Sequence, residues 1–214
     1  MVRILGFIAA VGPVVFVLGI VAAGAVYPGY DHVDQMISEL GGADATHPWL
    51  QNMNFVLFGL SVVGLALALV LDAHRLLAGA VLLAALGIFG TTLEGIVHCD
   101  SGCLGNTAAG QAHLVSGLFG FVCGITALFL LARHWRNDPR WSAHARLTRR
   151  LAWLALIGLI VFVASDATPR FDGLAQRVFV APLLVFCAST GWRLFRLASA
   201  PAGAHDREAA ASAA

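Results

Sequence analysis

Long apolar stretches are the feature that most constrains this chain. Each is long enough to cross, as a helix, a hydrocarbon layer about 30 Å thick. Six recur among the 214 residues, at about residues 4–27, 50–71, 76–97, 111–132, 148–168 and 175–196. Only 12% of the residues are charged, against about 25% in soluble domains. The sequence therefore predicts an all-α, polytopic transmembrane six-helix bundle over residues 1–197, with a disordered cytoplasmic tail over residues 198–214.

The arginines predict how the bundle sits in the membrane. With the N-terminus inside, eleven of the thirteen basic residues fall in cytoplasmic segments: Arg3, Arg75, Arg133, Arg136, Arg140, Arg146, Arg149, Arg150, Arg193, Arg196 and Arg207. Only Arg170 and Arg177 fall outside. The positive-inside rule thus predicts a multi-pass protein of the cell inner membrane or plasma membrane with both termini in the cytoplasm. The first stretch exceeds the about 7–15 apolar residues of a signal peptide, so we expect it to remain as an anchor.

The overall charge argues against one class of partner. The formal net charge is only +1, so the chain has no basic field that would recruit nucleic acid. We expect membrane lipids as partners and no nucleic acid.

The first predicted outer loop has the spacing of a short amphipathic helix. Its apolar residues recur at helical intervals between Asp31 and Gly41, which predicts one apolar face at the membrane interface. Asp31 suits the N-cap, and Gly41 suits a left-handed closing position. The polar face then carries His32, Gln35, Ser38 and Glu39. A glutamate at a helix C-terminus opposes the helix dipole, so we expect Glu39 to bind a ligand or form an ion pair.

Glu94 lies about one turn inside the outer end of the third apolar stretch. Ionisable groups at such depth usually face a partner or a cavity, which makes Glu94 a functional candidate. His98 follows four residues later, so a continuing helix would place both on one face. The alternative is a pair of Glu94 with His98 or with an arginine that only fastens two helices. Glu94, Asp100 and Ser38 are the candidate catalytic residues.

Two cysteines lie just beyond this stretch. Cys99 and Cys103 can close a small loop in an oxidising compartment, and we expect them to form a disulfide. A zinc site is the alternative, because His98, Asp100 and His113 are also nearby in the sequence and are of ligand type. Its spacing matches no standard structural zinc module.

Three histidines fall on the predicted outer side. His32, His98 and His113 would suit a metal ion, with a carboxylate activating water, as in a metal-dependent hydrolase acting on a lipid. The same composition also fits three independent histidines at the membrane interface.

The last outer segment supplies the two outer arginines. We expect Arg177 to contact Asp166, Glu39 or Glu94, since a bidentate pair is strong in a dry site. A lipid phosphate is an alternative partner. Glu39, Asp166, Arg170 and Arg177 are therefore the candidate ligand-binding residues.

Several short motifs together resemble a known family. They are Met36-Ile-Ser-Glu-Leu-Gly41, Asn52-Met-Asn-Phe55, Cys99-Asp100, His113 and Gly173-Leu-Ala-Gln-Arg177. The chain resembles the six-span bacterial and archaeal membrane family catalogued as domain of unknown function 998. More distantly, it is similar to membrane proteins of the damage-regulated autophagy modulator type. The resemblance implies six spans and no established reaction.

Three function classes follow from these residues. The leading one is an integral membrane protein whose outer polar site binds a lipid headgroup or small ligand. The others are a metal-dependent lipid hydrolase and a non-enzymatic assembly or helper protein. Transport is less favoured, because no internal repeat is evident.

Overall fold

The computed structural model describes residues 1–165 and 171–199. Six α-helices account for most of this part, and none of its residues is in a strand. They are α1 (Val2–Ala25), α2 (Pro48–Ala73), α3 (Ala78–Gly87), α4 (Ala108–Trp135), α5 (Ser142–Ser165) and α6 (Asp172–Leu197). The predicted all-α membrane bundle is therefore confirmed.

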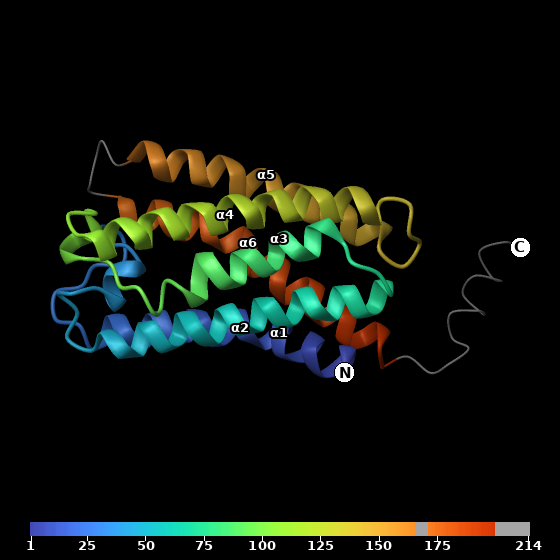
Figure 1. The fold of residues 1–214 in the computed structure, drawn as a ribbon, viewed down its shortest axis with the longest axis horizontal. Coiled ribbons are helices and arrows are strands. Elements are labelled where there is room, and N and C mark those ends of the chain that lie inside the picture. Colours follow the sequence, from blue (N-terminus) through green and yellow to red (C-terminus); the bar gives the residue numbers. More distant parts are fainter. Residues whose placement is uncertain (166–170, 200–214) are drawn as a thin grey trace, which may run out of the picture.

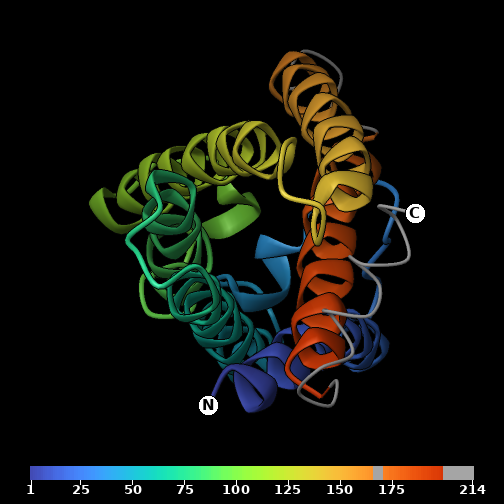
Figure 2. The ribbon, with the colours of Figure 1, turned by 90° about the vertical axis from the view of Figure 1, so that its right-hand side faces the viewer.

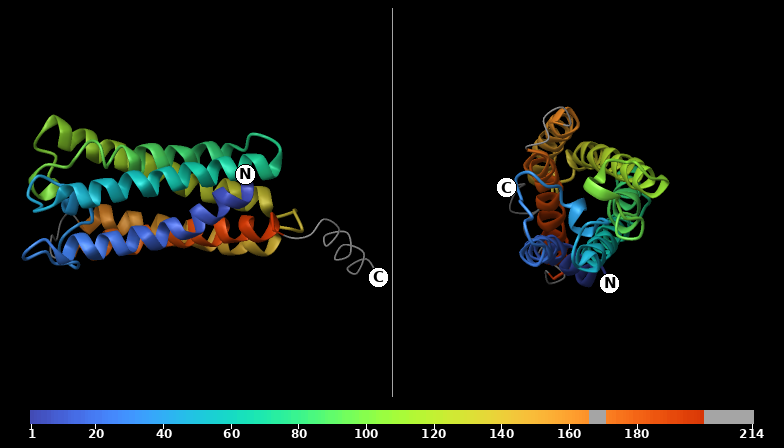
Figure 3. Two further views of the ribbon diagram at one scale, coloured as in Figure 1. Left: turned by 90° about the horizontal axis from the view of Figure 1, so that it is seen from below. Right: turned by 90° about the vertical axis from the view of Figure 1, so that its left-hand side faces the viewer.

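The six helices run along the long axis of the molecule, each antiparallel to the one before it (Figure 1). Each helix packs against its neighbours in the chain, and α6 returns to pack against α1. The result is a closed ring, seen from its two ends in Figure 2 and in the right panel of Figure 3. A ring of this kind has an interior, and the side chains that fill it decide what the protein can bind.

Five of the helices are long and apolar enough to cross a membrane: α1, α2, α4, α5 and α6. The third is shorter than the predicted span over residues 76–97. Its α-helical part ends at Gly87, and one π-helical turn, η2 (Ile88–Thr92), follows. Threonine and glycine are weak helix formers, and residues Thr91, Thr92 and Gly95 end the helix early. The predicted six-span count is thus not confirmed.

Glycines set the close approach of the helices around the ring. A Cβ atom on Gly120 of α4 would overlap the backbone of Gly90 in η2. A Cβ atom on Gly59 of α2 would likewise meet the carbonyl oxygen of Gly87 in α3. Small residues at such contacts are the usual means of helix association in membranes. They hold the short third helix tightly between its two neighbours.

The first loop forms a cap rather than the predicted amphipathic helix. Only η1 (Ser38–Gly41), a 3₁₀ helix, is helical, and the loop before it consists of turns. The Asp31 carboxylate caps one such turn, accepting the backbone N–H of Val33 at 2.7 Å. Gly41 is not left-handed, so that part of the prediction is wrong.

The backbone of this loop forms turns of its own and also bonds to α6. The N–H of Leu174 donates to the carbonyl of Val33 at 2.8 Å, which satisfies a free donor of the first turn of α6. Ile37 and Leu40 are almost fully buried. Ile37 and η1, here called the cap, thus close one end of the ring (Figure 2). We call this the capped end.

Candidate functional site

A buried pair of ionisable side chains lies just below the cap. Glu94 follows η2, and His113 comes from the second turn of α4. Oε2 of Glu94 is 2.6 Å from Nε2 of His113, and both side chains are about 5% exposed or less. Ser116 donates its hydroxyl to Oε1 of Glu94 at 2.6 Å. Both carboxylate oxygens of Glu94 therefore have partners on α4.

The contacts of His113 fix how many protons the pair holds. Its Nδ1 lies 2.8 Å from the carbonyl oxygen of Val97. A carbonyl only accepts, so Nδ1 carries a hydrogen. The contact between Nε2 and Glu94 then also needs one proton, on either atom. The pair is an imidazolium with a carboxylate or an imidazole with a carboxylic acid, and its net charge is zero in both cases.

The predicted pairing of Glu94 with His98 is wrong. The helix ends before the two residues complete a turn, and His98 is exposed. The partner of Glu94 lies nineteen positions later in the chain, on the next helix. Glu94 follows the π-helical turn η2 closely. Such turns occur frequently at functional sites.

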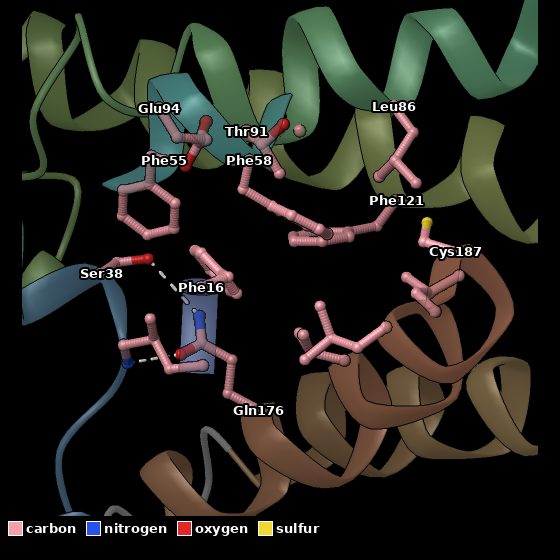
Figure 4. Close-up of a pocket in the computed structure, with 15 residues that line it drawn as sticks. Phe16, Ser38, Phe55, Phe58, Leu86, Thr91, Glu94, Phe121, Gln176 and Cys187 are labelled. Atoms are coloured by element: carbon pink, nitrogen blue, oxygen red, sulfur yellow. Dashed lines mark hydrogen bonds between the residues drawn. The ribbon is translucent and has the colours of Figure 1, made fainter. Parts of the chain in front are cut away.

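A small cavity lies inside the ring, under the cap. Its volume is about 30 Å³, which is room for about one water molecule. Figure 4 shows that its polar lining gathers at one end, from Ser38, Glu94 and Gln176. The rest of the lining is apolar: Phe16, Ile37, Phe55, Phe58, Leu86, Gly90, Phe121, Val180, Leu183, Leu184 and Cys187, with Thr91 beside Glu94. The cavity is therefore amphipathic.

Gln176 of α6 joins this cavity to the cap. Its Oε1 accepts the backbone N–H of Ile37 at 2.5 Å, and its Nε2 donates to Oγ of Ser38 at 3.4 Å (Figure 4). The side chain is 7% exposed. An amide nitrogen has two hydrogens, so one more donor is available at the polar end of the cavity.

Arg177 fastens the first loop to α6 through neutral partners. Its guanidinium donates to the carbonyls of Gln35 and Gly173 at 2.9 and 2.8 Å. It also contacts Oη of Tyr30 at 2.8 Å and Nδ1 of His32 at 2.9 Å. Among the described residues no carboxylate is paired with it, so the predicted pairs with Glu39 and Glu94 are wrong.

Burial and this arginine change the titration of the loop. Burial, and then the charge of Arg177, lower the pKa of His32. Burial raises the pKa of Tyr30, although Arg177 acts in the opposite direction. A neutral His32 accepts the hydrogen bond from Arg177, and a protonated one would not.

The two outer cysteines form the predicted disulfide. Sγ of Cys99 lies 3.4 Å from the carbonyl oxygen of Ser38, so the bridged loop packs against the cap. Asp100 accepts the backbone N–H groups of Gly105 and Thr107 at 3.0 and 2.8 Å. Burial acts to raise the pKa of Asp100, but these hydrogen bonds lower it overall. Asp100 thus has a structural part in this loop.

The three predicted metal ligands do not meet. His32 contacts Arg177, His113 contacts Glu94, and His98 is exposed. In the described part of the chain, no group of three or more His, Cys, Asp or Glu side chains is placed to hold a metal ion. The zinc alternative built on the two cysteines also fails, because they are bonded to each other.

The remaining predicted ligand-binding residues have varied outcomes. Glu39 accepts the backbone N–H of Met36 at 2.7 Å and the amide of Gln35 at 3.2 Å, both within its own loop. Asp166 and Arg170 lie outside the described residues, as does most of the predicted tail.

Sequence reasoning did not assign roles to Gln176 and Ser116. Ser116 lies three residues after His113, on the same helical face, in a mostly apolar helix. Gln176 directly precedes Arg177 at the start of an apolar stretch. A search for polar residues at the inward positions of predicted spans would have found both.

Comparisons with known proteins give one match. A family model described as protein of unknown function (DUF998) matches residues 10–193. No curated protein and no solved structure matches the chain. The likeness to damage-regulated autophagy modulator proteins therefore stays a prediction.

Proposed function

This chain belongs to the DUF998 family of proteins of unknown function, and we propose that it is a membrane-embedded protein that binds a small amphipathic molecule under its cap. The head group of the ligand occupies the polar end of the cavity, between Glu94 and Gln176. Its apolar part extends among the aromatic and aliphatic side chains below.

One observation carries this proposal: the polar and apolar linings of the cavity are separated. Ser38, Glu94 and Gln176 gather at the end under the cap, whereas Leu86 and Cys187 lie at the opposite end (Figure 4). Ligand sites are typically apolar cavities with a few placed polar groups that orient the ligand. If these side chains served only to fill the interior of the ring, polar groups at one end of the cavity would not be needed.

The hydrogen-bonding groups indicate a neutral head. The Glu94–His113 pair has no net charge, so an ionic head would be buried without a counter-charge. The oxygens of Glu94 keep lone pairs that can accept a hydrogen, and the Gln176 amide can donate one. A hydroxyl or primary amide head offers both a donor and an acceptor. Alcohols and amides with an alkyl chain are therefore the expected ligand class.

The cavity volume of about 30 Å³ corresponds to a closed state. An alkyl chain needs more room than one water molecule, so binding requires the cap or the aromatic side chains to move. The cap is a short helix held by side-chain bonds from Gln176 of α6 and Asn52 of α2.

The orientation is part of the proposal. We call the end of the ring opposite the cap the arginine-rich end. Ten arginines of the described residues lie at or near it: Arg3, Arg75, Arg133, Arg136, Arg140, Arg146, Arg149, Arg150, Arg193 and Arg196. The positive-inside rule assigns that end to the cytoplasm. The disulfide then lies on the outer side, where such bonds persist.

The assembly or helper function is the second candidate. The fastening of the first loop by Arg177 supports it, because those contacts are satisfied within the chain and have no need of a ligand. The metal-dependent hydrolase has no comparable observation in its favour.

Photolabelling tests the binding function. The protein in lipid nanodiscs would be labelled with a diazirine-bearing long-chain alcohol, and the labelled residues mapped by mass spectrometry. We expect labels on residues that line the cavity, and competition by dodecanol and dodecanamide but not by dodecanoate. Label confined to the lipid-facing surface would overturn the proposal.

Two substitutions make the test specific. Gln176→Leu removes a donor to the head, and we expect about tenfold weaker competition, the size of one hydrogen bond. Leu183→Trp fills the cavity and should abolish internal labelling. Gln111→Leu and Leu174→Trp are the matched controls, because both residues are exposed. Equal loss in the controls would show that the effect is unspecific.

A further inference from the structure

Two adjoining grooves open at the arginine-rich end, where the loop between α2 and α3 approaches the loop between α4 and α5 (Figure 1). The larger, of about 630 Å³, lies beside Trp135 and Trp141. The smaller, of about 350 Å³, lies between the start of α3 and the end of α4. Arg75 and His134 line both grooves.

Cations gather where the two grooves meet. A guanidinium nitrogen of Arg75 lies 3.2 Å from both ring nitrogens of His134. Arg133 lines the smaller groove beside them. No Asp or Glu of the described chain lines this smaller groove. Two guanidinium groups and an imidazole therefore share a space that has no anion of its own.

The nearest carboxylates are already engaged. Asp72 and Asp138 line the larger groove, and both contact Arg140, at 3.4 and 3.2 Å. Neither forms an ion pair with Arg75 or Arg133 in the described residues. The positive charge of the smaller groove thus stays available to a ligand.

The part of the smaller groove away from the cations is aliphatic. Leu76 is 75% exposed and Leu130 is 37% exposed, and Leu77, Ala78, Gly79 and Leu131 complete the apolar lining. The groove combines cations with an aliphatic lining from the start of α3 and the end of α4. Guanidinium groups bind phosphate through paired hydrogen bonds, and basic pockets between membrane helices bind anionic headgroups.

We propose that the groove between α3 and α4 binds the phosphate of an anionic phospholipid. Arg75 and Arg133 hold the phosphate, His134 supports Arg75, and an acyl chain lies along Leu76 and Leu130. This site is separate from the cavity under the cap, at the opposite end of the ring.

Lipid binding to the intact protein tests the proposal. Native mass spectrometry would compare phosphatidylglycerol with phosphatidylcholine, whose choline cation the arginines repel. We expect phosphatidylglycerol to bind about tenfold more tightly. The double substitution Arg75→Gln and Arg133→Gln should remove this preference. The change Arg75→Lys and Arg133→Lys should keep part of it, because the charge remains but the paired hydrogen bonds are lost.

The control is a second pair of arginines at the same end. Arg146 and Arg196 are exposed and line neither groove, so Arg146→Gln with Arg196→Gln should leave the preference unchanged. Displacement of phosphatidylglycerol by millimolar inorganic phosphate would assign the site to a free phosphate compound. Equal binding of the two lipids, or equal loss of preference in both double variants, would overturn the proposal.

Discussion

The two ends of the ring differ in how far their charged side chains are exposed. At the capped end, Glu94 is buried against His113, and Arg177 is surrounded by neutral acceptors. At the arginine-rich end, Arg75 and Arg133 face open grooves. At the capped end, these charged groups are engaged within the protein. At the other end, the arginines are presented to the surroundings, as expected of a surface that contacts charged headgroups.

Two pairs of ionisable side chains make this contrast measurable. The Glu94–His113 pair at the capped end is about 5% exposed or less. The Arg140–Asp72 pair has side chains that are 42% and 17% exposed. Removing one partner of a buried pair leaves an uncompensated group, whereas exposed pairs contribute little. The two pairs should therefore differ in their effect on stability.

The largest effect is expected for His113→Leu. It strands the buried Glu94 carboxyl, and the loss should be about 3–5 kcal/mol. Arg140→Gln, the matched change at the other end, should cost less than about 1 kcal/mol. Unfolding by dodecyl sulfate in mixed micelles measures both free energies. Similar losses in the two variants would remove the contrast between the ends.

A double substitution separates the pair from simple packing. If the cost of His113→Leu comes from the stranded carboxyl, then adding Glu94→Met should recover part of the lost stability. If the two losses add instead, the pair has no special coupling. The same micelle titration gives the answer.

An intermediate effect is expected for Arg177→Gln. The change removes charge-assisted hydrogen bonds to the first loop, each of the kind worth about 1.5–3 kcal/mol. We expect the stability to fall by about 2–3 kcal/mol and the loop near Pro28 to become sensitive to protease. The control is Arg196→Gln, because Arg196 is exposed. Arg193→Gln is not a suitable control, because Arg193 also packs on Trp141. Protection from protease equal to that of the unaltered protein would show that other contacts hold the cap.

The smallest effect is a pH dependence from His32. Its pKa is lowered from the ordinary 6.5 by burial and by Arg177, so the unfolded chain takes up the proton more readily than the folded one. The contribution is fully present above about 6.5 and is lost as the pH falls below that value. In the His32→Gln variant, the melting temperature should therefore fall less steeply as the pH is lowered below about 6.5. The groups facing His32 are Arg177, Tyr30 and Asp31.

The sequence predicted the fold better than the contacts of the site. Apolar length gave the all-α bundle, because it follows from the thickness of the hydrocarbon layer. It overestimated the third helix, which ends at a π turn and the weak helix formers Thr91, Thr92 and Gly95. The loop near Asp31 has the spacing of a helix, but its backbone forms turns and bonds to α6.

For the site, depth in the membrane correctly marked Glu94 as a residue with a partner. The spacing rule offered His98 as one partner, which is wrong because the helix does not continue. The true contact with His113 joins two segments across a loop, and no local pattern encodes it. Arg177 was correctly expected to be held, yet two of its four acceptors are backbone carbonyls, which have no signature in a sequence.

The single proton shared by Glu94 and His113 has a consequence for what the cavity exchanges. A neutral ligand can bind and leave without altering the protonation of the pair. A cationic ligand would have to displace that proton to keep the buried site uncharged. Calorimetry in buffers of different ionisation enthalpy gives the number of protons released on binding. That number therefore distinguishes a site that binds a neutral ligand from one that exchanges a proton for a cation.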